Sequence, residues 1–309
     1  MGNSLCDKYR PKELTEIMGN DDLVQSLGSV LRSEVGRPHT FLFQGPSGCG
    51  KTTLARITAR MLGGGVASIK EKNIAEFRGI DQARDLIRES RMLPLGAKCS
   101  IYVLNECHKA TNEFQNAMLE ILEEPPAYVY FILCTTDPGK LLATVRSRCA
   151  MFQVQLLSRP FMTKLLRWVI TEEKLKFSDN LVREIIAIAD GSPRKALIAL
   201  DQIRNISDEN LAIQSLVDST IDDDSILDIC RTLLLETSSV DKWKKLAPKL
   251  KAIVKDAEEA RLAILGYMGT VMLNSPSDKV LGIIDVFSPN FRDSGRAGFV
   301  ASCYLASRL

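Results

Sequence analysis

An eight-residue glycine-rich segment at 45–52, with the sequence GPSGCGKT, constrains this chain more than any other feature. It matches the phosphate-binding pattern G-x-x-x-x-G-K-[ST] at every defined position. An apolar run at 40–43 precedes it and a stretch with helical spacing at 53–62 follows, so we expect a buried strand, the loop and a helix. The glycines let backbone N–H groups face a phosphate, and the positive end of the helix adds attraction. The segment therefore predicts a nucleoside triphosphate site.

Individual residues of this loop have expected roles, with ATP and Mg²⁺ as the predicted cofactors. Lys51 can reach the β- and γ-phosphates, and the Thr52 hydroxyl can ligate Mg²⁺. The rest of the loop is expected to surround the phosphates. The predicted phosphate-binding residues are Gly45, Pro46, Ser47, Gly48, Cys49, Gly50, Lys51, Thr52 and Thr53.

The composition is that of a soluble globular protein, with 45% hydrophobic and 25% charged residues over a length that allows two or three domains. No apolar run is long enough to cross a membrane, and the first residues do not resemble a secretory signal. The eight cysteines are scattered and form no C-x-x-C pair, which indicates reduced thiols and a cytoplasmic location. A net charge of +2 neither requires nor excludes nucleic acid.

Apolar strands alternate with helices in the first half of the chain, which predicts a parallel α/β sheet with helices on both faces. Only helical patterns follow Pro160. We expect domains at 1–157, 158–220 and 221–309. The predicted strands are 39–44, 100–104, 129–135 and 150–154. The predicted helices in this part of the chain are 21–34, 50–62, 80–91, 112–124, 161–173, 178–190 and 193–203.

A phosphate-binding loop needs an acidic residue at the end of a neighbouring strand. The apolar run at 101–104 leads into Asn105 and Glu106, and we expect Glu106 to orient and deprotonate the attacking water. A solvated carboxylate at a strand end is the simpler alternative. The position of Asn105 normally carries Asp, which orders Mg²⁺ through a water molecule. An amide is nearly isosteric but uncharged, so the sequence predicts weaker Mg²⁺ binding and slower turnover.

Three further polar residues follow the later strands. The Thr136 hydroxyl can bond the γ-phosphate, although capping of the following turn explains a threonine equally well. Arg148 lies too far along the chain for its own site, which favours an arginine supplied in trans to a neighbouring subunit. Arg194 opens a later helix, where its residue type and position alone favour a surface arginine.

These segments together resemble the AAA+ sliding-clamp loader ATPases, the class that includes the bacterial DNA polymerase III gamma/tau subunits and the small subunits of replication factor C. The order and spacing of the motifs make the resemblance specific, and it runs from residue 8 to about residue 224. The motifs are KYRP at 8–11, the loop at 45–52, FRGID at 77–81, LEEPP at 122–126, TTDP at 135–138, SRC at 147–149, GSPR at 191–194 and TIDDD at 220–224.

The resemblance implies a role for each matching residue. Tyr9, Arg10 and Pro11 would line the adenine pocket. Thr136 and Arg194 would be the first and second sensors of the γ-phosphate, and Arg148 would be the arginine finger acting in trans. The implied catalytic set is therefore Glu106, Lys51, Thr136, Arg148 and Arg194. Thr52, and Asn105 through water, would hold the metal. Arg78, Arg84 and Arg88 would contact DNA phosphates, although a solvated basic helix face is an equal alternative.

The resemblance also implies an architecture and a function. The second domain would be a three-helix lid and the third a helical collar that assembles a pentameric ring. The chain would use ATP hydrolysis to open a sliding clamp and load it on primer–template DNA, with other loader subunits and the polymerase holoenzyme as partners and no membrane. The apolar residues at 92–95 fall where such loaders touch the clamp, although ordinary core packing explains them equally well.

Two other functions stay open at this point. Asn105 is compatible with a structural subunit that binds ATP without hydrolysing it. Another AAA+ DNA motor, such as a branch-migration helicase, is disfavoured by the segments at 122–126 and 147–149. The chain departs from gamma/tau proteins in lacking their four-cysteine zinc module, and it ends without a tau-like tail.

Overall fold

The computed structural model describes residues 4–33, 35–63, 67–94, 96–206, 208–218, 224–235, 239–252, 256–291 and 293–309. It divides into two compact units, Met1–Asp201 and Gln202–Leu309, which are described separately. The predicted boundary at 220 lies outside the described residues, so the predicted division into three domains stays a prediction. Within the described parts of the chain, no helix combines the length and the apolar character that a membrane crossing needs.

The first unit contains a five-stranded parallel sheet in the order β2-β3-β4-β1-β5. This confirms the predicted α/β class. The prediction missed β2, because its sequence ASIKEKN is mostly polar and charged, as suits a strand at the edge of a sheet. The strands are β1 (Thr40–Gln44), β2 (Ala67–Asn73), β3 (Cys99–Asn105), β4 (Val129–Thr135) and β5 (Ala150–Gln153).

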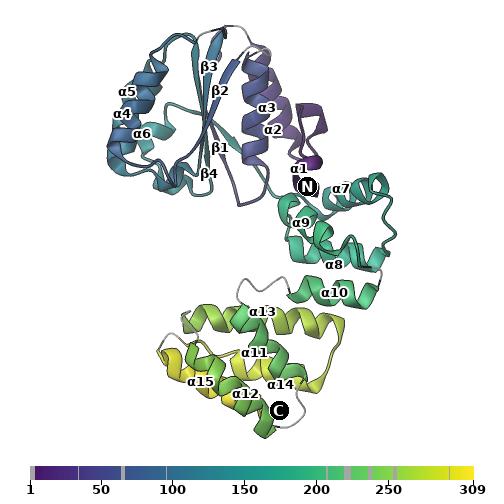
Figure 1. Cartoon of the computed structure of the whole chain (residues 1–309). Coiled ribbons are helices and arrows are strands. Elements are labelled where there is room, and N and C mark those ends of the chain that lie inside the picture. Colours follow the sequence, from purple (N-terminus) through teal and green to yellow (C-terminus); the bar gives the residue numbers. More distant parts are fainter. Residues whose placement is uncertain are drawn as a thin grey trace. The chain divides into compact units, whose positions relative to one another are not determined.

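Side chains alternate between the two faces of each strand, and each face has its own helices (Figure 1). Phe41 and Phe43 pack with α2 (Asp21–Arg32) and α3 (Lys51–Gly63). Leu42 points to the other face, towards helices α4, α5 and α6. These three helices span Ile80–Ser90, Asn112–Glu123 and Ala143–Arg146. Burial of both faces explains why β1, β3 and β4 read as continuous apolar runs.

The unit begins with the short helix α1 (Leu5–Lys8) and ends with three longer helices. These are α7 (Arg159–Glu172), α8 (Asp179–Ala189) and α9 (Pro193–Ile203), the last of which reaches the boundary between the units. They match the predicted three-helix arrangement closely. Ser178 caps α8, because its hydroxyl accepts a hydrogen bond from the Leu181 N–H.

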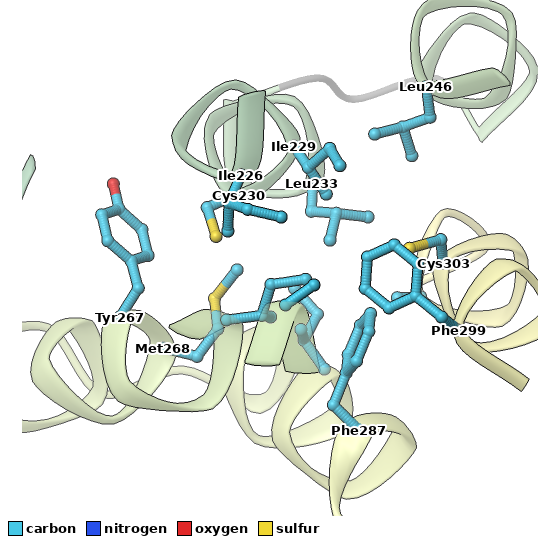
Figure 2. Packing of buried hydrophobic residues seen from close by; sticks show 14 of the residues in the cluster. Ile226, Ile229, Cys230, Leu233, Leu246, Tyr267, Met268, Phe287, Phe299 and Cys303 are labelled. Atoms are coloured by element: carbon cyan, nitrogen blue, oxygen red, sulfur yellow. The ribbon is translucent and has the colours of Figure 1, made fainter. Parts of the chain in front are cut away.

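The second unit is helical throughout its described residues and has a core of its own (Figure 2). Ile226, Leu233 and Met268 belong to that core, as do the aromatic rings of Phe287 and Phe299, which meet edge to face at 6.2 Å. The helices are α10 (Glu209–Asp218), α11 (Asp224–Leu235), α12 (Ser239–Ala252), α13 (Ala257–Asn274), α14 (Asp278–Phe287) and α15 (Gly295–Ala306).

Candidate active site

The carboxyl ends of the central strands meet at one edge of the sheet. Gln44 at the end of β1 is in register with Thr135 at the end of β4, and Leu104 near the end of β3 is in register with Leu133. The Gly45 N–H donates to the Thr135 carbonyl at 3.2 Å, which ties the start of the glycine-rich loop to β4. The loop and the polar residues after β3 and β4 are therefore brought together, as expected for a parallel sheet.

At two positions in the loop, both the backbone angle and a close neighbour require glycine. Gly45 and Gly48 have φ angles of +154° and +74°, which side-chain-bearing residues rarely adopt. A Cβ on Gly45 would lie 2.1 Å from the Val154 carbonyl oxygen, and one on Gly48 would lie 2.2 Å from the Ser192 hydroxyl of the segment before α9. The loop is consequently held between β5 and the start of α9.

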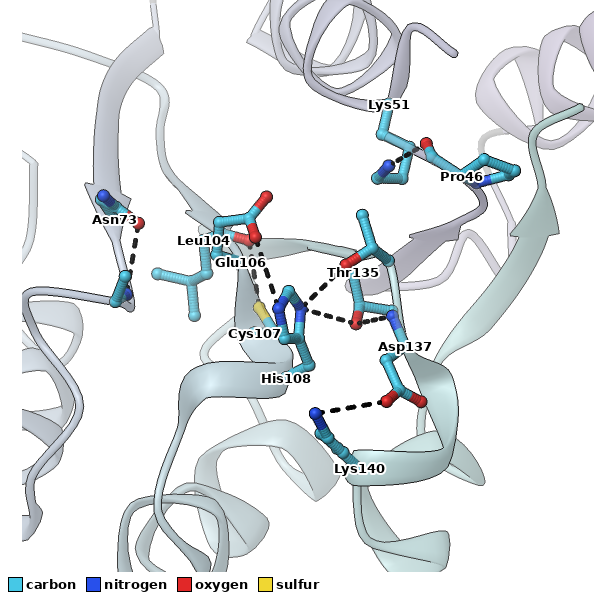
Figure 3. Close-up of polar contacts among 12 residues, drawn as sticks. Pro46, Lys51, Asn73, Leu104, Glu106, Cys107, His108, Thr135, Asp137 and Lys140 are labelled. Atoms are coloured by element: carbon cyan, nitrogen blue, oxygen red, sulfur yellow. Dashed lines mark hydrogen bonds and ion pairs between the residues drawn. The ribbon is translucent and has the colours of Figure 1, made fainter. Parts of the chain in front are cut away.

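Lys51 is 7% exposed and turns back over its own loop (Figure 3). Its ammonium group donates to the carbonyl oxygens of Gly45 at 2.8 Å and Pro46 at 2.6 Å. Cys49 lies beside it, and burial raises the pKa of that thiol although the Lys51 charge opposes the shift. The loop therefore presents a cation and a neutral thiol, which suits an anionic ligand.

A chain of hydrogen bonds links α3 to the ends of β3 and β2. The Thr52 hydroxyl donates to Asn105 Oδ1 at 3.0 Å, and Asn105 Nδ2 donates to Glu71 Oε1 at 2.7 Å. Arg56 holds the Glu71 carboxylate with two hydrogen bonds of 2.8 and 3.0 Å. The hydrogen bond to Glu71 raises the pKa of Arg56. Sequence reasoning found Thr52 and Asn105 but missed Glu71, because it did not recognise β2 as a strand.

Glu106 has a left-handed backbone, with φ at +56°. Its carboxylate lies 3.4 Å from Nε2 of His108, a 7% exposed side chain (Figure 3). Nδ1 of His108 lies 3.4 Å from the Thr135 hydroxyl and 3.3 Å from the Thr136 hydroxyl. With a proton on Nε2 the ring can donate to Glu106, and the single lone pair of Nδ1 can accept from one of the two hydroxyls. His108 thus connects the predicted base to the predicted first sensor.

A cavity of about 760 Å³ brings most of the predicted nucleotide-binding residues together. The loop, the N-terminal segment, the end of β3 and the helices α7 and α9 all contribute to its walls. The volume is in the range typical of small-molecule sites. Predicted residues that line it are Tyr9, Arg10, Pro11, Ser47, Gly48, Cys49, Gly50, Lys51, Thr52, Thr53, Glu106 and Arg194.

The N-terminal wall of the cavity is bound to helix α7 by Tyr9. The Tyr9 hydroxyl donates to the Glu173 carboxylate at 2.5 Å, and its ring meets Trp168 edge to face at 5.1 Å. Lys8 donates to the same carboxylate at 2.5 Å, and this hydrogen bond raises its pKa. The wall therefore combines segments about 160 residues apart in the chain. Trp168 also lines the cavity, and no sequence pattern marks it as a site residue.

The remaining predicted residues lie outside this cavity. Arg148 donates to the Glu123 carboxylate at 3.1 and 2.5 Å and to the Thr144 carbonyl at 2.8 Å. Arg84 and Arg88 are exposed on α4, where each pairs with an aspartate one turn earlier at 3.2 and 3.3 Å. Arg78 is exposed in the turn before α4. The roles proposed for these arginines need a partner molecule.

Comparison with known proteins gives matches over most of the chain. A family model described as DNA polymerase III, delta subunit, matches residues 65–158. DNA polymerase III subunit gamma/tau of Mycobacterium tuberculosis is 33% identical over 224 residues, covering 65% of this chain and 38% of that protein. DNA polymerase III subunit gamma of Buchnera aphidicola is 29% identical over 290 residues, covering 85% of this chain and 79% of that protein.

Solved structures show the same fold. The RuvB Holliday junction branch migration motor of Thermotoga maritima superimposes with a TM-score of 0.57 at 18% identity, covering 77% of this chain and 85% of that chain. At this identity the likeness concerns the fold alone. The chain spans about two fifths of the length of the mycobacterial relative. These matches confirm the predicted resemblance to the gamma/tau subunits and the predicted fold class.

Proposed function

We propose that this chain, a relative of the DNA polymerase III gamma/tau subunits, is an ATP-hydrolysing subunit of a sliding-clamp loader. The observation that carries the proposal is the grouping of a complete phosphate-binding loop with Glu106 and Arg194 around one cavity, while Arg148 lies outside it. A site that lacks its arginine finger within one chain is suited to completion by a neighbouring subunit.

The nucleotide would occupy the cavity with its adenine beside Tyr9, Arg10 and Pro11. Its phosphates would meet the backbone N–H groups at the start of α3. Lys51 would exchange the two carbonyl oxygens that it now contacts for β- and γ-phosphate oxygens. A neutral carbonyl is a weaker acceptor than a phosphate oxygen, so this exchange favours binding.

The donor atoms at the end of β3 fit Mg²⁺. Thr52 and Asn105 present hard oxygen atoms, Oγ1 and Oδ1, that lie 3.0 Å apart. In the proposed site Thr52 would ligate the ion and Asn105 would order it through water. An ion held there would neutralise part of the charge that develops on the phosphates during transfer.

Hydrolysis would proceed by in-line attack of water on the γ-phosphate, without a covalent intermediate. Glu106 would orient the water and accept its proton. Thr136 would leave His108 to donate to the γ-phosphate, and Arg194 would contact the same group from α9. Because His108 contacts both Glu106 and Thr136, the base and the sensor would respond together to the nucleotide.

Arg148 would act on the ATP of an adjacent subunit. Its present hydrogen bonds hold the guanidinium at the protein surface with 26% of the side chain exposed. In the proposed pentameric ring, the Arg148 guanidinium would leave Glu123 and contact the phosphoryl group that is transferred from the neighbouring subunit's ATP. The second unit would supply the collar that holds the ring together.

The proposed DNA and clamp contacts lie on α4 and in the segments directly before and after it. Arg78, Arg84 and Arg88 would meet the phosphates of primer–template DNA. Met92 and Leu93 are 61% and 74% exposed and adjacent in the chain, which fits a docking role for the clamp. Leu95, the last residue of that apolar run, lies outside the described residues. The polymerase holoenzyme in the cytoplasm is the proposed setting.

The test is the ATPase activity of the chain with its companion subunits, clamp and primer–template DNA. Clamp and DNA should together stimulate hydrolysis. Arg148→Ala should leave ATP binding intact and reduce turnover of the assembly by at least 10³-fold, the usual contribution of an arginine finger. Arg91→Ala is a matched control, because Arg91 pairs with Glu120 on the same helix as Glu123. Stimulated turnover by the Arg148→Ala assembly at the wild-type rate would refute the trans arrangement.

A further inference from the structure

The edge strand β2 places a carboxylate beside the one residue of the site that departs from the family pattern. Asn73 of β2 is in register with Asn105 of β3, and Glu71 lies two residues earlier on the same face of β2. Asn105 Nδ2 donates to Glu71 Oε1 at 2.7 Å. The glutamate therefore contacts the amide of Asn105 directly.

This contact decides which way the amide faces. An ionised carboxylate can only accept hydrogen bonds, so the NH₂ group of Asn105 must face Glu71. The carbonyl oxygen Oδ1 then faces the opposite way, where it accepts the hydrogen bond of the Thr52 hydroxyl at 3.0 Å. Without the carboxylate, either end of the amide could face Thr52.

Arg56 fixes the carboxylate in its turn. It lies four residues after Thr52 on α3, so both side chains are on one face of that helix. Nε and Nη2 of Arg56 donate to the two oxygens of Glu71 at 2.8 and 3.0 Å. Two parallel hydrogen bonds leave the carboxylate little freedom to rotate.

We propose that Glu71 is a positioning residue, held by Arg56, that turns the amide of Asn105 so that an oxygen faces the metal side of the site. An aspartate needs no such help, because both of its terminal atoms are oxygens. The inference rests on the proposed function, since it concerns the Mg²⁺ that accompanies ATP. It explains how an uncharged residue can serve at this position.

The same geometry predicts electrostatic repulsion between Glu71 and an aspartate at position 105. Asn105→Asp would place two carboxylates at hydrogen-bonding distance with no proton between them. The added charge should therefore give little gain in metal affinity while Glu71 is present. In the double variant Glu71→Gln with Asn105→Asp, the new amide donates to the new carboxylate and the conflict disappears.

The test measures the affinity of Mn²⁺, by electron paramagnetic resonance, for each variant saturated with ATPγS. Glu71→Gln should weaken Mn²⁺ binding about 10-fold or more, as loss of an orienting partner usually does. Asn105→Asp should differ from the wild type by less than about threefold, whereas the double variant, in which Glu71 no longer opposes the added charge, should bind Mn²⁺ more tightly than Asn105→Asp. Arg56→Lys, which loosens the carboxylate, should weaken binding in the same direction as Glu71→Gln.

Glu89→Gln is the matched control, because Glu89 also pairs with cations of β2, Lys70 and Lys72, but does not contact Asn105. An effect of Glu71→Gln no larger than that of Glu89→Gln would overturn the inference, as would a 10-fold gain from Asn105→Asp alone. If the folded wild-type chain showed no nucleotide-dependent Mn²⁺ binding, the proposed function itself would fail. Circular dichroism establishes that each variant is folded.

Discussion

Replacing Gly48 by alanine tests how closely the phosphate-binding loop packs against the start of α9. The alanine would keep the φ of +74° at this position, and its Cβ would lie 2.2 Å from the hydroxyl of Ser192. That hydroxyl caps α9 by accepting from the Lys195 N–H at 3.3 Å. The methyl group must therefore force the cap out of position.

The expected loss of stability follows from these two effects. A side chain in the left-handed region costs about 1–2 kcal/mol. Losing a serine cap costs about 1 kcal/mol. Gly48→Ala should therefore destabilise the first unit by about 2–3 kcal/mol, summing the strain and the lost cap. Gly36→Ala is the control for strain alone, because Gly36 has a φ of +70° and open space around it.

A double variant separates the clash from the strain. Ser192→Ala removes the cap by itself, so Gly48→Ala made in that background should cost only about 1–2 kcal/mol. The two changes should thus be non-additive by about 1 kcal/mol. Urea unfolding followed by Trp168 fluorescence, in a Trp243→Phe background, measures each value. Additive losses, or equal losses for Gly48→Ala and Gly36→Ala, would refute the packing argument.

Three further outcomes are expected. His108→Ala should lower kcat of the assembly by about 10-fold or more with little change in KM, because the histidine positions the base without touching nucleotide; steady-state kinetics test this. Arg84→Gln with Arg88→Gln should flatten the salt dependence of duplex DNA binding by about two units in a log–log titration, and an unchanged slope would remove both residues from the DNA surface. Burial raises the pKa of Cys107 to about 12. Iodoacetamide at pH 8 should therefore modify Cys6 but not Cys107 until the chain unfolds, which mass spectrometry would detect. The free energy of unfolding should fall as the pH rises above about 9, because the Cys107 thiol then ionises in the unfolded chain before it ionises in the folded one.

The sequence predicted those parts of the fold that depend on local patterns. Strand β4 spans Val129–Thr135 as expected, because a long apolar run at the centre of a sheet is buried on both faces. The prediction for α4 began at the observed first residue, Ile80. The glycine-rich loop needed no structure at all, since its spacing is itself the signal.

The rest depended on register, which a single sequence does not reveal. Glu71 became part of the site because β2 pairs with β3, and its lysines and glutamates gave no apolar alternation to mark it as a strand. No pattern in the sequence marked His108 as part of the site. Its contacts with Glu106 and Thr136 arise because the chain turns after β3 and meets the end of β4.

The left-handed backbone of Glu106 places opposing demands on that position. Successive residues of a strand face opposite sides, yet Asn105 contacts Thr52 of α3 and Glu106 lines the cavity that α3 also borders. The turn at Glu106 makes this possible at a cost of about 1–2 kcal/mol for a residue with a side chain. Glycine would relieve that cost and remove the carboxylate. Selection for a more stable fold would therefore favour glycine at this position, whereas selection for the proposed hydrolysis would favour glutamate. Such a trade-off is seen where function requires strain.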